Sequence, residues 1–317
     1  MRNAFLAAAM GLALAVPVAP SHAADHTVVD AAGRTITIRS TDRIVAIGGA
    51  VTEILYALGL DDQIAAVDVT STWPPAATEK PSVGYMRTLS PEGVLSLAPD
   101  LILAIEGSGP AETIAVLEKA SIPFVLVPEA HDGEGVLKKV RFIADAVGVA
   151  EKGEELAEAI SEDLATVAGM RKRIETKRSA VFVLAMSGGS PMVAGEDTSA
   201  EGVFALAGVD NALTGFTGFK RANEEATMAA QPDAVVVMAE RGHALTADKV
   251  FAVPAFATTP AAKEKRLVSL PGSYLLGFGP RVAHAARDLA AGVYPELVLP
   301  ALPERPWTGH EPADAGQ

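Results

Sequence analysis

Residues 150–177 read AEKGEELAEAISEDLATVAGMRKRIETK and separate two halves of the chain that each contain several short apolar runs. Acidic residues dominate the first half of this stretch and basic residues its end, which is the charge order that complements a helix dipole. The pattern predicts one long helix of about 25 residues that joins the two halves as a stiff connection. Its apolar side chains recur at helical spacing, at Leu156, Ile160, Leu164, Val167 and Ile174.

Runs rich in β-branched and aliphatic residues occur on both sides of this helix, and each is bounded by turn residues or helix-like segments. Nearly continuous apolar strands that alternate with helices are typical of parallel sheets covered on both faces. The sequence therefore predicts two α/β lobes with central parallel sheets, joined by a single long rigid helix, with a ligand cleft between the lobes. The expected strands lie within 43–49, 63–69, 100–107, 123–129, 179–189, 233–242 and 266–272.

The N-terminus has the features of an export signal. Arg2 precedes an apolar run, and Ser21-His22-Ala23 fits the small-x-small pattern of a signal-peptidase site. We expect the signal to end at Ala23 and the remainder to divide into four parts. These are an N-terminal lobe (24–149), the linker helix (150–177), a C-terminal lobe (178–303) and a polar tail without structure (304–317).

Composition excludes several classes of function. The chain has no cysteine, so it offers no lipid-anchor thiol, disulfide or thiolate metal site. Its formal net charge of -13 becomes -14 once Arg2 is removed with the signal, and an acidic protein is a poor partner for nucleic acid. We expect a freely diffusing, monomeric protein in the periplasm of a Gram-negative bacterium.

The sequence gives little indication of a catalytic site. The chain contains no G-x-S-x-G nucleophile elbow and no phosphate-binding glycine loop. Ser187 lies in the turn-like sequence MSGGSPM, but nothing assigns it a base, so an exported serine hydrolase is a remote alternative. The histidines are scattered and form no pair with the spacing of a zinc site.

Tyr85 and Arg87 lie in the loop KPSVGYMRTLSPEG, just before a predicted helix with Ser90 as its N-cap and Pro91 at its first position. A phenol becomes an anionic ligand at neutral pH only when a metal and a nearby cation favour the phenolate. Arg87 would supply that cation, and tyrosine is a known axial ligand of haem. A surface tyrosine with an exposed hydroxyl is the alternative interpretation.

A weak internal repeat relates the two halves. The stretches at 90–104 and 223–237 share a glutamate, then Pro-Asp seven residues later, then a strand. Glu92 and Glu225 are the two glutamates, and an offset of 133 residues separates every matched pair. The repeat indicates either two related lobes or a coincidence between short helices that precede a strand.

Taken together, these features resemble the periplasmic haem-binding proteins of bacterial haem-uptake ABC transporters. That family lies within the wider class of siderophore and cobalamin binding proteins, and the resemblance covers essentially the whole mature chain. The motifs that carry it are RIVAIGGAVTEILYALGL, VGYMRTLSPEGVLSLAPDLILA, VMAERG and YLLGFGPR.

The resemblance implies a carrier of ferric haem that performs no bond chemistry. Tyr85 would be the axial ligand of the iron, with Arg87 bonded to its phenolate. Glu92 and Glu225 would pair with arginines of the inner-membrane permease, which links the carrier indirectly to a cytoplasmic ATPase.

Two further residues are expected to contact the haem. Arg241 would meet a propionate, and Tyr274 would cover the porphyrin face. The stretch 184–192 has no histidine that would hold a second, stacked haem, so one haem is expected. A ferric-siderophore or cobalamin binding protein of the same class is the main alternative.

Overall fold

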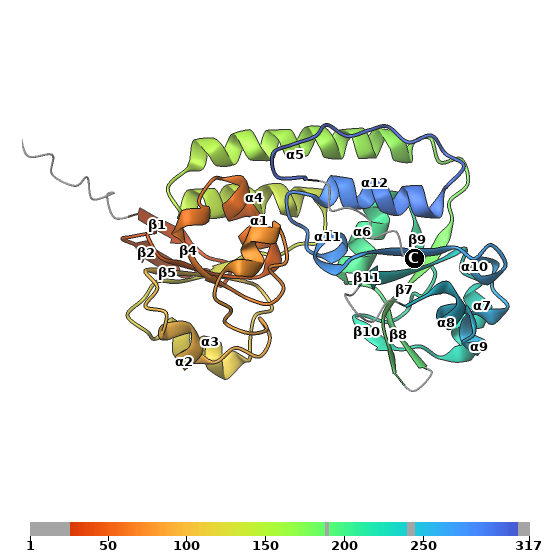
Figure 1. The fold of residues 1–317 in the computed structure, drawn as a ribbon, viewed down its shortest axis with the longest axis horizontal. Coiled ribbons are helices and arrows are strands. Elements are labelled where there is room, and N and C mark those ends of the chain that lie inside the picture. Colours follow the sequence, from red (N-terminus) through yellow and green to blue (C-terminus); the bar gives the residue numbers. More distant parts are fainter. Residues whose placement is uncertain (1–25, 188–189, 240–244, 310–317) are drawn as a thin grey trace, which may run out of the picture.

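The computed structural model describes residues 26–187, 190–239 and 245–309. It shows two lobes side by side beneath one long helix, α5 (Ala150–Arg171) (Figure 1). The predicted export signal, Arg241 and His243 lie outside the described residues. Within the part of the chain that is described, no helix has both the length and the apolar character needed to cross a bilayer.

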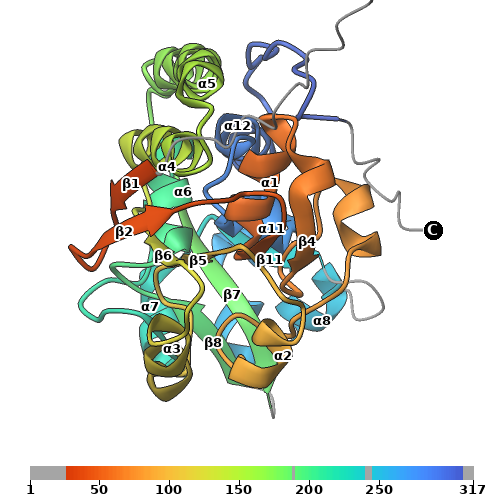
Figure 2. The same cartoon turned by 90° about the vertical axis from the view of Figure 1, so that its left-hand side faces the viewer.

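The N-terminal lobe contains a parallel sheet with the strand order β4-β3-β5-β6. All four strands fall where the sequence predicts them. A hairpin that the sequence does not predict, β1 and β2, precedes the sheet (Figure 2). The strands are β1 (His26–Val29), β2 (Thr35–Ile38), β3 (Ile44–Ile47), β4 (Ile64–Val67), β5 (Leu101–Ile105) and β6 (Phe124–Val127).

Helices cover both faces of this sheet. Alternate side chains of β3 and β5 point to opposite faces, so Val45 and Ile102 pack with the α2 and α3 side, whereas Ile44 and Leu101 pack with the α1 and α4 side. The α-helices are α1 (Gly49–Ala57), α2 (Pro91–Leu95), α3 (Ala111–Glu118) and α4 (Gly133–Ala146), with short 3₁₀ helices at Asp61–Gln63 and Pro75–Glu79.

The C-terminal sheet has the predicted parallel centre, formed by β7, β11 and β12, and adds antiparallel strands at one edge. Its order is β10-β8-β7-β11-β12, with β9 beside β7, and β8 and β10 run antiparallel to their neighbours. Only two residues separate Ser187 from its partner Ser190, and so short a connection can only return the chain antiparallel. The strands are β7 (Ser179–Ser187), β8 (Ser190–Ala194), β9 (Asp210–Asn211), β10 (Phe219–Arg221), β11 (Ala234–Ala239) and β12 (Leu267–Pro271).

The helices of the C-terminal lobe are mostly short, and α12 is the longest of those described. It lies beneath α5, next to α6 (Figures 1 and 2). They are α6 (Ser199–Ala207), α7 (Glu224–Ala230), α8 (Ala247–Phe251), α9 (Pro254–Ala257), α10 (Pro260–Lys263), α11 (Gly272–Leu276) and α12 (Val282–Val293).

The linking helix α5 is shorter than the sequence predicts. It ends at Arg171 rather than continuing to Lys177, and Lys172 caps it. Ile174 then turns inward and packs against Gly208, because the chain must leave the helix to enter β7 at Ser179. The helix packs along α4 of the first lobe and α12 of the second, so it contacts both lobes rather than only spanning a gap.

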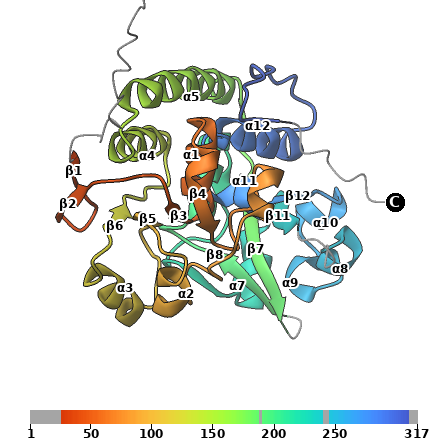
Figure 3. The ribbon, with the colours of Figure 1, turned by 60° about the vertical axis from the view of Figure 1, so that its left-hand side comes forward.

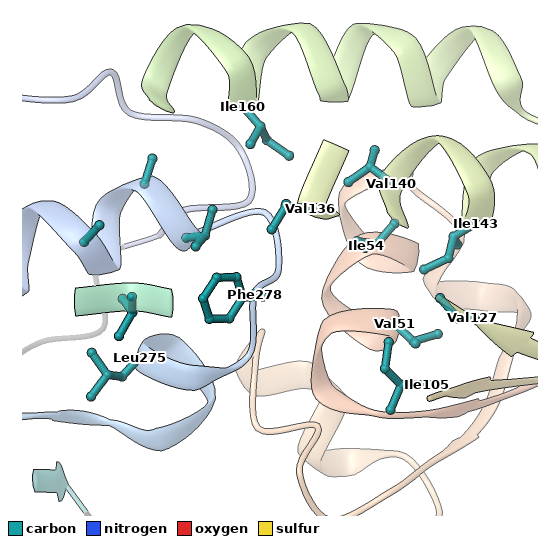
Figure 4. Close-up of a cluster of buried hydrophobic side chains, with 14 of the residues drawn as sticks. Val51, Ile54, Ile105, Val127, Val136, Val140, Ile143, Ile160, Leu275 and Phe278 are labelled. Carbon is teal, nitrogen blue, oxygen red and sulfur yellow. The ribbon is translucent and has the colours of Figure 1, made fainter. Parts of the chain in front are cut away.

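One hydrophobic core continues across the boundary between the lobes. Val136 and Val140 of α4, Ile160 of α5 and Phe278 of the C-terminal lobe belong to a single cluster of buried side chains (Figure 4). A shared apolar interface of this kind restricts movement of one domain against the other. We therefore expect only small changes in the angle between the lobes.

A buried ion pair crosses the same boundary. Arg281, which precedes α12, donates from Nη2 to Glu53 Oε1 of α1 at 2.7 Å and from Nε to Oε2 at 3.0 Å. The two side chains are 4% and 5% exposed. The guanidinium also contacts the rings of Trp73 and Tyr274, at 4.4 and 5.0 Å from their centroids. Because Glu53 belongs to α1 and Tyr274 to α11, Arg281 holds these two helices close together (Figure 3).

A second buried cation holds the same segment of the C-terminal lobe. Lys139 of α4 is fully buried, and its Nζ donates to Glu129 Oε1 at 2.6 Å and to the carbonyl oxygen of Phe278 at 3.2 Å. Burial lowers the pKa of Lys139, and the Glu129 carboxylate opposes that shift. The N-terminal lobe thus binds both ends of the segment 278–281.

The first part of the predicted polar tail is ordered, which corrects the expectation for residues 304–309. Arg305 Nη2 pairs with Asp163 and Glu162 of α5, both at 2.9 Å. The carbonyl oxygen of Trp307 accepts a hydrogen bond from Trp73 Nε1 at 3.1 Å. The tail therefore returns from the C-terminal lobe across α5 to the N-terminal lobe (Figure 1).

We expect Glu53→Gln to lower the free energy of unfolding by about 3–5 kcal/mol, because the Arg281 charge would remain buried without its carboxylate. Urea unfolding followed by circular dichroism measures the change. Glu154→Gln is the matched control, since Glu154 binds Arg141 through the same two nitrogens on the exposed surface and its loss should change stability little. Equal unfolding midpoints for the two variants would contradict the structural role of the buried pair.

Candidate ligand-binding site

The loop that carries Tyr85 is fixed by backbone hydrogen bonds on both sides. Val69 N donates to the carbonyl oxygen of Gly84 at 3.0 Å, and Gly109 N donates to that of Met86 at 2.9 Å. The loop thus lies against the segments that follow β4 and β5, at the carboxyl edge of the parallel sheet. This is the edge at which ligands bind in open α/β sheets.

The Tyr85 side chain points outward from this rigid loop and is 41% exposed. Arg87 is also exposed. Among the described residues, neither the Tyr85 hydroxyl nor the Arg87 guanidinium has a protein hydrogen-bond or ion-pair partner. A phenol and a guanidinium left free on a fixed backbone are suited to binding a group from outside the chain.

Asp68, which the sequence analysis missed, organises the neighbouring loop. Its carboxylate is buried and accepts hydrogen bonds from Gly48 N, from the backbone and hydroxyl of Thr70, and from the Ser71 hydroxyl, all at 2.9–3.1 Å. An aspartate directly after a strand, followed by threonine and serine, is the sequence signal for such a turn. The turn thus fixes the backbone that follows β4, next to the loop that carries Tyr85.

The helix after Tyr85 begins as predicted. Ser90 Oγ accepts a hydrogen bond from Gly93 N at 3.3 Å, and Pro91 is the first residue of α2. Glu92 occupies the second position and is exposed. In the other lobe, Asn223 caps α7 and Glu225 occupies the same second position, also exposed.

The internal repeat extends well beyond these glutamates. The same offset of 133 residues separates the first residues of α2 and α7, Pro91 and Glu224, and those of β5 and β11, Leu101 and Ala234. It also separates Ala98 and Gln231, which both adopt positive φ angles, of 47° and 46°. Agreement in three independent features favours related lobes over coincidence.

Tyr274 lies in α11 with its hydroxyl already occupied. The hydroxyl donates to Asp288 Oδ2 at 2.8 Å, and the ring lies against Arg281. Burial raises the pKa of Tyr274, and the Asp288 carboxylate raises it further. These contacts belong to the C-terminal lobe, so a role for the ring at a ligand stays a prediction.

The other residues considered in the sequence either lie outside the described residues or make contacts within the fold. The backbone of Ser187 ends β7, and its side chain is outside the described residues, as is Arg241. The His131 ring packs on Phe278 at 5.3 Å, and burial lowers its pKa. No group of three or more His, Asp or Glu side chains suited to a metal ion occurs in the described ranges.

A partly open pocket of about 190 Å³ lies elsewhere, between α1 and the C-terminal tail. It is smaller than the roughly 300–1,000 Å³ of typical ligand pockets. None of the residues predicted to contact a ligand lines it. Its lining includes Tyr56, Trp73, Pro280 and Trp307, so it results from the packing of the tail rather than from the site around Tyr85.

Several known proteins resemble this chain over most of its length. A profile described as "Periplasmic binding protein" matches residues 44–274. A solved structure of the periplasmic heme-binding protein BhuT in complex with two hemes is 36% identical, with a TM-score of 0.75, and the match covers 79% of this chain and 97% of BhuT. RhuT of Roseiflexus sp. RS-1, a periplasmic heme-binding protein in apo form, is 34% identical, covers 81% of this chain and 99% of its own, and has a TM-score of 0.76.

A relative known from sequence gives a compatible result. The uncharacterized ABC transporter substrate-binding lipoprotein YvrC of Bacillus subtilis (strain 168) is 28% identical over 274 residues, which are 85% of this chain and 86% of that protein. The fold of two α/β lobes joined by a long helix agrees with the solved structures.

Proposed function

This chain belongs to the periplasmic binding protein family, and we propose that it captures haem and delivers it to the permease of a haem-uptake ABC transporter. The observation that carries the proposal is the rigid loop that presents Tyr85, with Arg87 two residues later, at the carboxyl edge of the sheet. The chain is a binding protein rather than an enzyme, so no catalytic role falls to Ser187.

Haem is the cargo in this proposal, and the chain's own residues determine how it is held. Tyr85 supplies a phenolate oxygen to the ferric iron, and Arg87 donates to that oxygen and favours its anionic form. A permanently charged guanidinium suits this task, because it stays protonated whether or not haem is bound. Arg241 would pair with a propionate and Tyr274 would border the porphyrin, as the sequence predicts.

We propose that one haem is bound. BhuT is described with two hemes, but the stretch 184–192 of this chain has no histidine to ligate a second iron. A ferric siderophore or cobalamin is the alternative cargo, and no feature of the described residues favours either over haem.

The permease is proposed to dock on Glu92 and Glu225. Their matched positions in α2 and α7 suit a partner with two-fold related surfaces, since each lobe then presents an equivalent acid. We also propose that residues 1–23 direct export to the periplasm, where the protein acts as a monomer.

Replacing Tyr85 with phenylalanine should abolish the phenolate-type, high-spin ferric spectrum and the tight binding of haemin, because the ring remains but the ligating oxygen is lost. Arg87→Gln should keep the spectrum and weaken affinity about 10- to 100-fold, as expected for a residue that supports a metal ligand. A haemin titration of each purified protein, followed by absorbance, measures affinity and stoichiometry.

Tyr56→Phe serves as the control, because Tyr56 lines the separate pocket beside the tail and should not affect binding. Saturation at one haemin per chain is expected. Unchanged binding and spectrum in Tyr85→Phe would disprove ligation by this residue, and a siderophore or cobalamin would become the better candidate.

Glu92→Gln and Glu225→Gln should each slow haem uptake severalfold while leaving haemin affinity unchanged, because they remove charges from a docking surface and not from the site. Transport into vesicles that contain the cognate permease and ATPase measures this effect. Glu151→Gln is the matched control, since Glu151 is also an acid in the first turn of a helix, α5, which lies on the opposite side of the molecule from α2 (Figure 2). Equal rates in all three variants would rule out docking through these acids.

A further inference from the structure

Two exposed residues, Val69 and Tyr85, lie on backbone segments that are hydrogen-bonded to each other at the carboxyl edge of the sheet. Isolated exposed hydrophobic residues are common, and Val29, Val116 and Val298 belong to this kind. Val69, however, is 53% exposed, and its backbone is bonded to Gly84, the residue before Tyr85, which is 41% exposed. An exposed apolar pair at a proposed ligand site suggests a contact surface for an apolar ligand.

The backbone joins the two residues directly. Val69 N donates to the carbonyl oxygen of Gly84, the residue before Tyr85, at 3.0 Å, and Val83 N donates to that of Val67 at 2.9 Å. Val69 and Tyr85 are therefore separated by one hydrogen bond and one peptide unit. Neither can move far without breaking this pairing.

Gly84, which accepts the hydrogen bond from Val69, has open space where a side chain would stand. It has a φ of +87°, and a Cβ added to it would meet no atom within 4 Å. A side chain there would project into this open space, whereas glycine leaves the backbone bare. The three residues thus offer a low, largely apolar surface, suited to the flat face of a ligand.

The surface is fixed before any ligand arrives. Asp68 and Thr70, on either side of Val69, are held by the turn hydrogen bonds described above. Two residues after Thr70, the Thr72 hydroxyl lies 2.7 Å from the Ser273 hydroxyl of the other lobe, so this loop also lies at the boundary between lobes. A preformed surface loses little conformational entropy when a ligand binds.

We infer that Val69, together with Gly84 and Tyr85, forms the surface on which one face of the porphyrin rests, so that Val69 is a haem-positioning residue. The inference rests on the proposed function and assigns to Val69 a part in selecting the cargo. A flat, apolar macrocycle covers the exposed valine, whereas a hydrophilic iron chelate would bury it against polar groups. Tyr85 then provides the bond to the iron. Val69 provides a contact with the porphyrin that does not depend on the iron.

Metal-free protoporphyrin IX separates these two contributions, because it has the ring and no iron. We expect Val69→Glu to weaken both haemin and protoporphyrin IX at least about tenfold, because the added carboxylate would lose hydration against the apolar face. Tyr85→Phe should lose the tight binding of haemin that depends on the iron bond, but bind protoporphyrin IX as the wild type does. Absorbance follows haemin, and protein-dependent porphyrin fluorescence follows the metal-free ring.

Val116→Glu is the matched control, since Val116 is 49% exposed on α3 and no part of the surface. It should bind both ligands normally. Thermal unfolding of Val69→Glu should match that of Val116→Glu, because both positions face solvent.

The outcomes separate the two hypotheses. If the wild-type protein binds neither haemin nor protoporphyrin IX, the proposed function fails. If it binds both, and Val69→Glu binds them with wild-type affinity, the proposed function stands and the inference about Val69 is overturned. Val69→Glu bound to haemin at saturation should still show the phenolate spectrum, since the iron ligand is intact.

Discussion

The buried ion pair between Glu53 and Arg281 determines how the two lobes meet. Two charges removed from water are costly unless their geometry is good and their remaining donors are satisfied. Here the contact is bidentate, and two aromatic rings cover the guanidinium. Any rotation that separated the lobes would break the bidentate contact and expose the two rings to water. The ion pair therefore holds the two lobes in one relative arrangement.

Lys139 strengthens this constraint by binding the carbonyl oxygen of Phe278, only three residues from Arg281. The segment between them is held by the N-terminal lobe at both ends, with a continuous hydrophobic core beneath it. A protein built this way does not depend on a wide hinge to enclose its ligand. Its affinity has to come from surfaces that are already in place, and the hydrogen-bonded loops around Tyr85 and Asp68 have that property.

The sequence predicts the parts of this fold that depend on local pattern. All seven expected strands occur, since each is an apolar run long enough to be buried by itself, and the cap of α2 follows from Ser90 and Pro91. Strand β10 was missed because it is short and largely exposed and has no apolar run. The sequence also could not predict the partner of Arg281, because Glu53 lies 228 residues away and a pair so distant in sequence leaves no periodic pattern.

The candidate site was easier to recognise than the contacts that stabilise the fold, for a physical reason. Tyr85 and Arg87 are two residues apart and exposed, and the described residues contain no protein partner for either side chain. Their spacing and chemistry therefore made them candidates, and the family resemblance made the haem role specific. The sequence did not mark Val69 as a candidate contact residue, because a valine at the end of a predicted apolar strand is expected to be buried. Exposed side chains on a rigid backbone can change with little effect on stability and a large effect on binding. Changes at the buried residues Glu53 and Arg281 should instead affect stability strongly and binding little. Substitutions at the exposed site can therefore alter ligand preference while the lobes keep their arrangement.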